Sequence, residues 1–306
     1  MPNCAPIVVF CYNRPSHLKT LIESIQLNKE AIDSDLYVFS DGAKNELDIP
    51  LVQEIRKYIS SLMGFKSIHC IWRENNIGLA KNVISGVSEV FVKYEKIIVL
   101  EDDLCVSENF LDYMNQSLAY YKDQPSIFSI SGYTAPIEIP SNYQPDVFLF
   151  YRINSWGWGT WRDRWEKMDW EIADFEIFIR NNQLRKAFNR GGEDCTPMLL
   201  RQMQGKINSW AIRFNYNCYK KSLLNIYPVI SKVSNTGNDG SGTHVKSTSY
   251  YNTSLDIEQK AVQLMMPELD SQIVSNYQHF FKKSFLRKII YSFNLYQYLI
   301  FNRFKS

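Results

Sequence analysis

The chain has 306 residues, of which 45% are hydrophobic and 22% charged, the balance of a folded protein large enough for one sizeable α/β domain. Its 34 Lys and Arg against 32 Asp and Glu leave a formal net charge of only +2. A net charge this small does not suggest nucleic-acid binding, so we expect no nucleic-acid partner.

The cysteines and the hydrophobic runs indicate the compartment. Six cysteines are scattered along the chain, without a Cys-x-x-Cys pair, which favours free thiols in a reducing environment. The first residues lack a basic segment followed by an apolar one, and no apolar run reaches the roughly 18 residues of a membrane span. We therefore expect a cytoplasmic protein.

In the first half of the chain, strands alternate with helices of about 10–15 residues. This alternation predicts βαβ units and a Rossmann-like, mostly parallel sheet with helices on both faces. The sequence has neither a Gly-x-Gly-x-x-Gly loop nor a P-loop, which counts against dinucleotide oxidoreductases and P-loop NTPases. Strands are predicted over 7–11, 36–42, 67–72 and 96–100, and helices over 15–28, 52–62, 80–93 and 108–121.

The fourth of these strands ends in three consecutive carboxylates, Glu101, Asp102 and Asp103. The carboxyl ends of parallel strands meet at one edge of a sheet, where open α/β folds bind their ligands. Adjacent carboxylates repel one another unless a proton or a cation neutralises them, and hard oxygen ligands suit Mg²⁺ or Mn²⁺ bridging to a diphosphate. The alternative is a solvated turn after a core strand.

From about residue 127 the composition changes. Further strands are predicted near 128–132 and 147–151, and five tryptophans fall between 156 and 170. Aromatic rings among glycines either form stacking platforms for sugar rings or fill the core between two subdomains. A helix is predicted over 195–204, directly after Glu193 and Asp194. The loop over 234–244, rich in Gly, Asn and Ser, suits a mobile loop that a bound ligand orders.

Together these segments resemble the GT-A fold glycosyltransferases, which use nucleotide sugars, over roughly residues 5–245. The nearest likeness is to family 2-like bacterial polysaccharide transferases, related to the N-acetylglucosaminyltransferase I group. The implied fold is α/β of the GT-A type with a C-terminal helical tail. The likeness rests on the order of Asn13-Arg14-Pro15, Ser40-Asp41-Gly42, Asn75-Asn76-Ile77-Gly78-Leu79-Ala80-Lys81-Asn82 and Val99-Leu100-Glu101-Asp102-Asp103-Leu104.

The last of these segments is similar to the family's DXD motif, which implies that Asp103 binds Mn²⁺ or Mg²⁺. The resemblance assigns a second metal contact to His244, in the late glycine-rich loop. The metal would hold the diphosphate of the donor. The residues expected to bind the rest of the donor are Phe10, Asn13, Arg14, Ser40, Asp41, Asn76, Gly78, Lys81, Asn82, Glu101 and Asp102.

The resemblance also implies a catalytic base. Glu193-Asp194 looks like the family's x-Glu-Asp element, so Asp194 or Glu193 would deprotonate the acceptor hydroxyl. The choice stays open because Ala211 stands where some relatives carry an acidic residue. The side chains expected to contact the acceptor are Trp156, Trp158 and Trp210.

The implied reaction is a metal-dependent, inverting transfer of a hexosyl or N-acetylhexosaminyl group from a nucleotide diphosphate donor to a glycan. UDP is favoured because the most similar relatives use it, and bacterial surface polysaccharide or lipopolysaccharide synthesis is the expected setting. One alternative is a non-catalytic carbohydrate-binding protein that uses the tryptophan cluster. The other is a sugar nucleotidylyltransferase, although the Gly-rich basic loop of that class is missing after the first strand.

We divide the chain into a nucleotide-sugar-binding half (1–126), an acceptor-binding and catalytic half (127–250) and a basic, aromatic, helical tail (251–306). Residues 279–306 hold six Lys or Arg, nine aromatics and no Asp or Glu, which predicts peripheral contact with an anionic membrane surface. The inner face of the cytoplasmic membrane is the expected surface, where the acceptor would be lipid-linked. The alternative is packing against the catalytic domain or a second copy, as in a homodimer.

Overall fold

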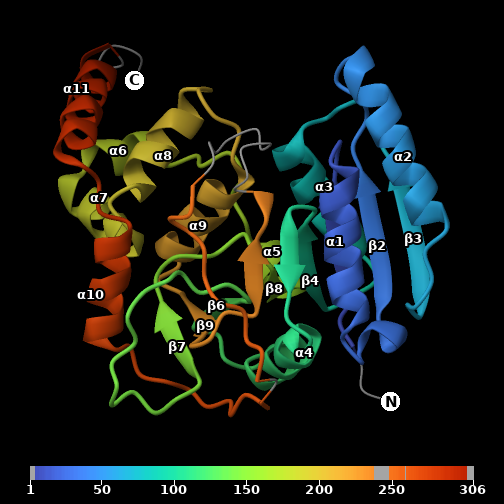
Figure 1. The fold of residues 1–306 in the computed structure, drawn as a ribbon. Helices are drawn as coiled ribbons and strands as arrows, with labels where there is room; N and C mark the ends of the chain where they lie inside the picture. The colour runs from blue at the N-terminus through green and yellow to red at the C-terminus, as the bar shows by residue number, and fades with distance from the viewer. Residues whose placement is uncertain (1–3, 238–247, 259, 302–306) are drawn as a thin grey trace.

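A computed structural model describes residues 4–237, 248–258 and 260–301 (Figure 1). Within these residues an eight-stranded sheet has the strand order β3-β2-β1-β4-β8-β6-β9-β7, and β5 and β10 form a separate antiparallel pair. Helices cover both faces of the large sheet (Figure 1). The predicted α/β fold of the GT-A type, with a helical C-terminal region, is confirmed.

The strands of the first half are parallel and those of the second half are mixed. β1 pairs in parallel with β2 and β4, and β2 with β3, whereas β8 is antiparallel to both β4 and β6. The strands are β1 (Ile7–Cys11), β2 (Asp35–Ser40), β3 (Ser67–Trp72), β4 (Lys96–Glu101), β5 (Leu104–Val106), β6 (Ile127–Ser131), β7 (Val147–Phe150), β8 (Trp158–Trp161), β9 (Leu224–Pro228) and β10 (Val233–Asn235).

The helices of the first half lie within a few residues of their predicted positions. The α-helices are α1 (Pro15–Gln26), α2 (Ile49–Ser60), α3 (Leu79–Phe91), α4 (Phe110–Tyr120), α5 (Arg162–Trp165), α6 (Phe175–Arg180), α7 (Asn182–Phe188), α8 (Cys195–Met203), α9 (Trp210–Lys220), α10 (Ser271–Phe280) and α11 (Phe285–Phe301). Short 3₁₀ helices are η1 (Ala31–Asp33), η2 (Glu46–Asp48) and η3 (Asn189–Gly191).

Strand β8 is the main element that the sequence did not reveal. It is built from Trp158-Gly159-Thr160-Trp161 and lies between β4 and β6, so one sheet joins the first and second halves of the chain. Gly159 is required there because a Cβ would lie 2.9 Å from both the Ile97 carbonyl oxygen and the Met114 Cε. Trp158 and Trp161 are therefore buried residues of a strand. The strand was not predicted because its aromatic-glycine sequence lacks the alternation of polar and apolar residues typical of a half-exposed strand.

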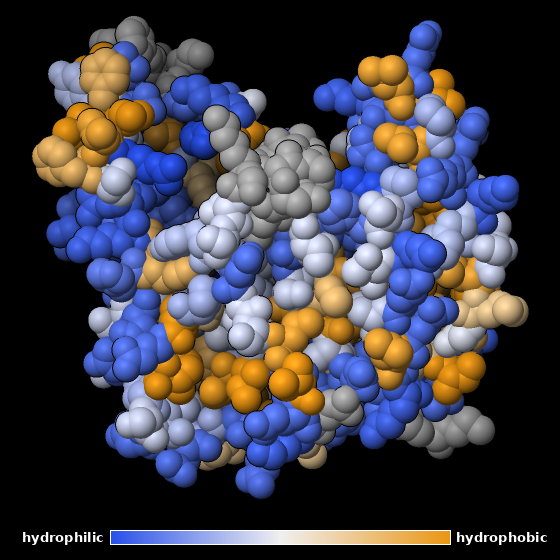
Figure 2. Space-filling view, in the orientation of Figure 1, coloured by the Kyte–Doolittle hydropathy of each residue, from blue (hydrophilic) through white to orange (hydrophobic). Residues whose placement is uncertain are grey.

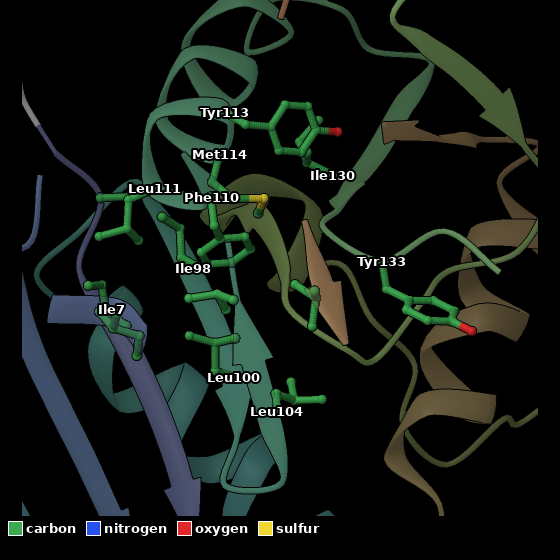
Figure 3. Packing of buried hydrophobic residues seen from close by; sticks show 14 of the residues in the cluster. Ile7, Ile98, Leu100, Leu104, Phe110, Leu111, Tyr113, Met114, Ile130 and Tyr133 are labelled. Atoms are coloured by element: carbon green, nitrogen blue, oxygen red, sulfur yellow. The ribbon is translucent and has the colours of Figure 1, made fainter. Parts of the chain in front are cut away.

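Alternate residues of the central strands enter two separate hydrophobic clusters, one on each face of the sheet. Ile98 and Leu100 of β4 join the cluster that includes α1, α2 and α4, whereas Ile97 and Val99 join the cluster that includes α3 and α9. Figure 3 shows Ile98 beside Phe110 on the first face. A third cluster lies among α6, α7, α8 and α9.

A buried ion pair fixes the chain after the undescribed segment 238–247. Lys232 and Asp256 form an ion pair, and their side chains are only 3% and 5% exposed. Asp256 also accepts a hydrogen bond from Asn109 Nδ2 at 2.8 Å. Burial alone would raise the pKa of Asp256, but the hydrogen bonds from Lys232 and Asn109 lower it below its usual value.

We predict that Lys232→Met lowers the free energy of unfolding by about 3–5 kcal/mol, because it leaves the Asp256 carboxylate buried without its partner. The double variant Lys232→Met/Asp256→Leu removes both charges and should recover most of that loss. Urea unfolding of the three proteins measures this. Equal destabilisation of the single and double variants would show that the ion pair does not explain the effect.

Candidate active site

The ends of β1, β2 and β4 lie side by side because these strands are parallel and in register. Phe10 is opposite Glu101, and Cys11 is opposite Ser40. The backbone continues this pairing past the strands: Asp102 N donates to the Phe10 oxygen at 3.0 Å, and Asp41 N donates to the Cys11 oxygen at 3.0 Å. The polar residues after each strand therefore meet at one edge of the sheet.

Asp103 pairs with Arg14 and keeps one oxygen unsatisfied. Its Oδ2 lies 3.3 Å from Arg14 Nη1, whereas its buried Oδ1 has no hydrogen-bond partner among the described residues. Burial raises the pKa of Asp103, and the nearby Arg14 and His17 partly oppose that rise. A buried carboxylate oxygen without a donor costs free energy unless a ligand completes it. Sequence analysis did not identify His17 as a neighbour of this group.

The two carboxylates before Asp103 are protonated more easily than usual. Burial, and then repulsion from Asp103, raise the pKa of Asp102 to about 7, although its Oδ2 accepts from Tyr12 N at 3.1 Å. Burial and repulsion from Asp103 and Asp102 raise the pKa of Glu101 to about 8, against a hydrogen bond from Trp210 that lowers it. The three acidic groups thus need a proton or a positive charge at neutral pH.

The chain after β10 lies directly on Asp103. Thr236 donates to the Asp103 carbonyl oxygen from its backbone N at 2.8 Å and from its hydroxyl at 2.9 Å. At Gly237 a Cβ would collide with Asp103 Oδ2 and lie 2.8 Å from Arg14 Nη1, so any larger residue would displace these side chains. The rest of the predicted mobile loop, including His244, lies outside the described residues.

Asn13 belongs to a polar network that the sequence did not predict. Asp48 accepts from the Tyr12 hydroxyl at 2.6 Å and from Asn13 Nδ2 at 2.7 Å, and Lys44 N donates to the Tyr12 hydroxyl at 2.9 Å. Burial and the bond to Asp48 raise the pKa of Tyr12 to about 12. This network joins the end of β1 to the loop after β2. Because Asp48 follows Asn13 by 35 positions, no local pattern could have indicated it.

Asp41 holds the loop that precedes α3. Its Oδ1 accepts from Ile77 N and its Oδ2 from Gly78 N, both at 3.0 Å, and Asn76 Nδ2 donates to the Gly42 oxygen at 2.9 Å. Gly78 has a φ of 78°, which favours glycine. The Asn-rich loop and the end of β2 are therefore brought together as expected, and Asp41 acts through the loop geometry.

Two other residues expected to bind the donor are hydrogen-bonded to partly buried arginines. Ser40 is fully buried and its hydroxyl accepts from Arg56 Nε at 3.3 Å. Asn82 is buried and its Oδ1 accepts from Arg73 Nε at 3.1 Å. Both side chains are therefore occupied by hydrogen bonds within the protein. Lys81, by contrast, is exposed at the start of α3.

The structure corrects three expected ligand contacts through burial. The Phe10 ring stacks on Phe39 in the core at 5.1 Å, so its side chain cannot reach a donor. Trp158 is completely buried, and Trp210 is buried against it with ring centroids 5.1 Å apart. These two indoles fill the core, which is the alternative that their aromatic composition left open. Trp210 still reaches the site through its hydrogen bond to Glu101.

Trp156 differs from the buried tryptophans. It is partly exposed and packs edge-on against Tyr133 and Tyr251, with centroids 4.6 Å and 5.6 Å away. Burial raises the pKa of Tyr251; the charge of Asp194 adds to that rise, and the charge of Arg152 opposes it. Of the three tryptophans expected to contact the acceptor, Trp156 is therefore the one whose side chain is partly exposed.

The two candidate bases have different surroundings. Asp194, 20% exposed, accepts two bonds from Arg152, at 2.7 Å and 2.9 Å. Glu193 instead accepts from Lys283 N at 3.0 Å and Lys288 Nζ at 2.9 Å, and although burial would raise its pKa, these bonds lower it. Glu193 thus faces the tail. Asp194 is thus bound to Arg152 of the catalytic domain, and both carboxylates keep lone pairs on their oxygens.

A divalent cation fits the donor set at the end of β4. The unsatisfied Asp103 oxygen is a hard ligand, and a positive charge would relieve the repulsion among the three carboxylates. Among the described residues there is no group of three His, Cys, Asp or Glu side chains that could hold a metal. Mg²⁺ and Mn²⁺ sites commonly take one or two carboxylates and complete their coordination with substrate phosphates and water, which suits this arrangement.

This sheet, with partly buried carboxylates at the end of its central parallel strand, places the protein in the GT-A class. The sequence model of glycosyl transferase family 2 matches residues 7–188, more than half of the chain. The chain therefore belongs to glycosyl transferase family 2 and is a glycosyltransferase. Membership of this family argues against the carbohydrate-binding and nucleotidylyltransferase alternatives.

Two solved structures are similar to this chain. The mannosyltransferase PcManGT from Pyrobaculum calidifontis, in complex with GDP-Man and Mn²⁺, is 10% identical, with a TM-score of 0.36 over 53% of this chain and 46% of its own. S. aureus TarS, residues 1–349, is 9% identical, with a TM-score of 0.41 over 76% of this chain and 61% of its own. The matches thus cover less than two thirds of either solved chain.

The raised pKa of Glu101 predicts how unliganded stability depends on pH. The folded state keeps this proton up to about pH 8, whereas the unfolded chain loses it near 4.5, so the contribution to stability is present at low pH and lost as pH rises through 8. Glu101→Gln mimics the protonated form. We expect it to gain roughly 1–3 kcal/mol relative to the parent protein between pH 5 and pH 9.

Chemical denaturation at several pH values measures this difference. Glu54→Gln is the matched control, because Glu54 is exposed on α2 and its replacement should track the parent protein at every pH. A constant difference between Glu101→Gln and the parent protein over this range would contradict the assignment.

Proposed function

We propose that this glycosyltransferase moves a sugar from a nucleotide diphosphate donor, with UDP as the nucleotide, to a glycan acceptor with inversion at the anomeric carbon. The observation that carries the proposal is the unsatisfied, buried Asp103 oxygen within a row of three carboxylates. This acidic edge would repel a diphosphate unless a cation lay between them. The Asn-rich loop held by Asp41 supplies the neighbouring wall.

In this proposal Asp103 holds Mn²⁺ or Mg²⁺, and His244 is the expected second protein ligand. The ion supplies positive charge that neutralises the leaving nucleoside diphosphate. Arg14, paired with Asp103, lies where it can add positive charge to the same phosphates. Glu101 and Asp102, with Asn13, Asn76, Gly78 and Lys81, would position the ribose and sugar at this edge.

We assign the base to Asp194 rather than Glu193. Each Asp194 oxygen accepts one hydrogen bond from Arg152, and each Glu193 oxygen accepts one from the tail. The choice therefore follows the x-Glu-Asp element that this segment resembles, in which the aspartate acts as base. Arg152 fixes the Asp194 carboxylate through two hydrogen bonds, and we place the acceptor on the side of Trp156. A glycan ring stacked on Trp156 would present its hydroxyl there, and Asp194 would take the proton as that oxygen attacks the anomeric carbon.

The acceptor is proposed to be a growing surface glycan on a lipid carrier, as in polysaccharide or lipopolysaccharide synthesis at the inner face of the cytoplasmic membrane. The basic, aromatic tail supports this setting. A thermal-shift screen of nucleotide sugars with and without Mn²⁺ identifies the donor. Donor at a hundredfold over its Kd stabilises the protein by about 2.7 kcal/mol.

For the metal site, EDTA should abolish transfer and Mn²⁺ or Mg²⁺ should restore it. Asp103→Asn keeps the shape of the side chain but weakens its grip on a cation, and should lower kcat/KM by roughly a hundredfold or more. The control Asp123→Asn, at an exposed position, should keep the parent activity. Full turnover in EDTA together with an active Asp103→Asn protein would remove the metal from the reaction.

For the base, Asp194→Asn should lower kcat by roughly a hundredfold or more, because an amide cannot take the proton of the acceptor hydroxyl. The substitution also removes the ion pair with Arg152, so donor affinity and thermal melting of the same protein check that the site stays intact. Glu193→Gln, one residue away, should stay within a few-fold of the parent kcat. Product anomers read by NMR should be inverted. If Glu193→Gln loses activity and Asp194→Asn does not, the two roles are reversed.

A further inference from the structure

Helix α11 is apolar on two opposite faces. On the inner face Tyr291, Leu295, Tyr298 and Leu299 pack on the cluster formed with α6 to α9. At about 100° per residue, the outward side chains occupy a separate arc of about 140°. This outer face, between 42% and 78% exposed, consists of Phe285, Leu286, Ile289, Ile290, Phe293, Tyr296 and Ile300.

Figure 2 shows this outer face as an orange and tan stripe where Figure 1 draws α11. Seven large apolar side chains on one arc, with the polar Gln297 among them, are unusual on the free surface of a folded protein, because each leaves its hydrophobic area in water. The inner face already binds the helix to the domain, so the outer face is not needed to hold α11 in place. Among the described residues nothing covers this face.

The charges around the outer face select the kind of partner. After Asp270 the sequence has no Asp or Glu. Lys282 and Arg287 are exposed at the amino-terminal end of α11, and the sequence adds Arg303 and Lys305 beyond the described residues. A second copy of the chain would bring the same positive charge to the contact, whereas an anionic lipid surface would neutralise it.

The length of α11 fixes how it can meet a bilayer. Its 17 residues extend about 25 Å, less than the roughly 30 Å of a hydrocarbon core. No helix among the described residues is long and apolar enough to cross a membrane. We infer that the outer face of α11 lies in the headgroup region of an anionic bilayer, with its apolar side chains buried and its basic residues at the phosphates.

Docking through α11 would also orient the active site. Lys288 and Lys283 both donate hydrogen bonds to Glu193. The centroid of the Phe281 ring lies 4.2 Å from the guanidinium carbon of Arg152, the residue that binds Asp194. The helix is thus joined to the segment before the proposed base. That consequence rests on the proposed function, because it assumes a lipid-linked acceptor, whereas the docking surface itself does not.

The test is flotation of the full chain with phosphatidylcholine vesicles, with and without about 30% phosphatidylglycerol. The variant Ile290→Glu/Phe293→Glu changes two outer-face residues, and Met63→Glu/Val92→Glu places the same charges at exposed apolar positions elsewhere. Matched thermal melting confirms folding. Light scattering of each protein gives its oligomeric state.

We expect binding to anionic vesicles only, weakened by high salt, with at least a tenfold lower partition coefficient for the outer-face variant and parent behaviour for the control. Equal binding by both variants, equal binding to neutral vesicles, or no binding by the parent protein overturns the inference. The inference is also overturned if the parent protein is a dimer that does not bind vesicles and that only the outer-face variant dissociates. Donor hydrolysis measured without vesicles tests the transferase proposal separately.

Discussion

The repulsion among Glu101, Asp102 and Asp103 is the constraint on which the rest of the site depends. The sheet register forces these carboxylates to the end of β4, and burial raises the pKa values of all three. Arg14 offsets only part of that charge and leaves one Asp103 oxygen unsatisfied. The protein thus accepts an unfavourable arrangement that a bound cation and diphosphate would relieve, a common trade of stability for function.

Two sets of contacts surround the carboxylate end of β4 in this account: the loops after β1 and β2, and the C-terminal tail. Asp48 and Asp41 fix the loops beside it through backbone and side-chain hydrogen bonds, at the edge where we propose that the donor binds. On the acceptor side, the tail reaches back through Lys288 to Glu193, next to Asp194. The proposed base is therefore held between the catalytic domain and the helix proposed to dock on lipid.

Sequence periodicity predicted the parallel half of the fold well, because its buried strands and amphipathic helices have strong local patterns. It did not predict β8, because this strand has only four residues, all of them buried, and is too short to show a periodic pattern. It also found the carboxylates of β4, which are contiguous. It could not find Asp48, Arg56 or Arg152, since each acts on a residue 16 to 42 positions away and only tertiary packing brings them together.

The most direct test of the central claim is calorimetric titration of UDP into the protein near pH 7.5, with and without Mn²⁺, in buffers of different ionisation enthalpy. The raised pKa values of Glu101 and Asp102 mean that neutralisation by a cation should release protons on binding. We predict tighter UDP binding with Mn²⁺ and a proton release that shrinks in Glu101→Gln. Binding of UDP that is indifferent to Mn²⁺ and releases no protons would contradict the account.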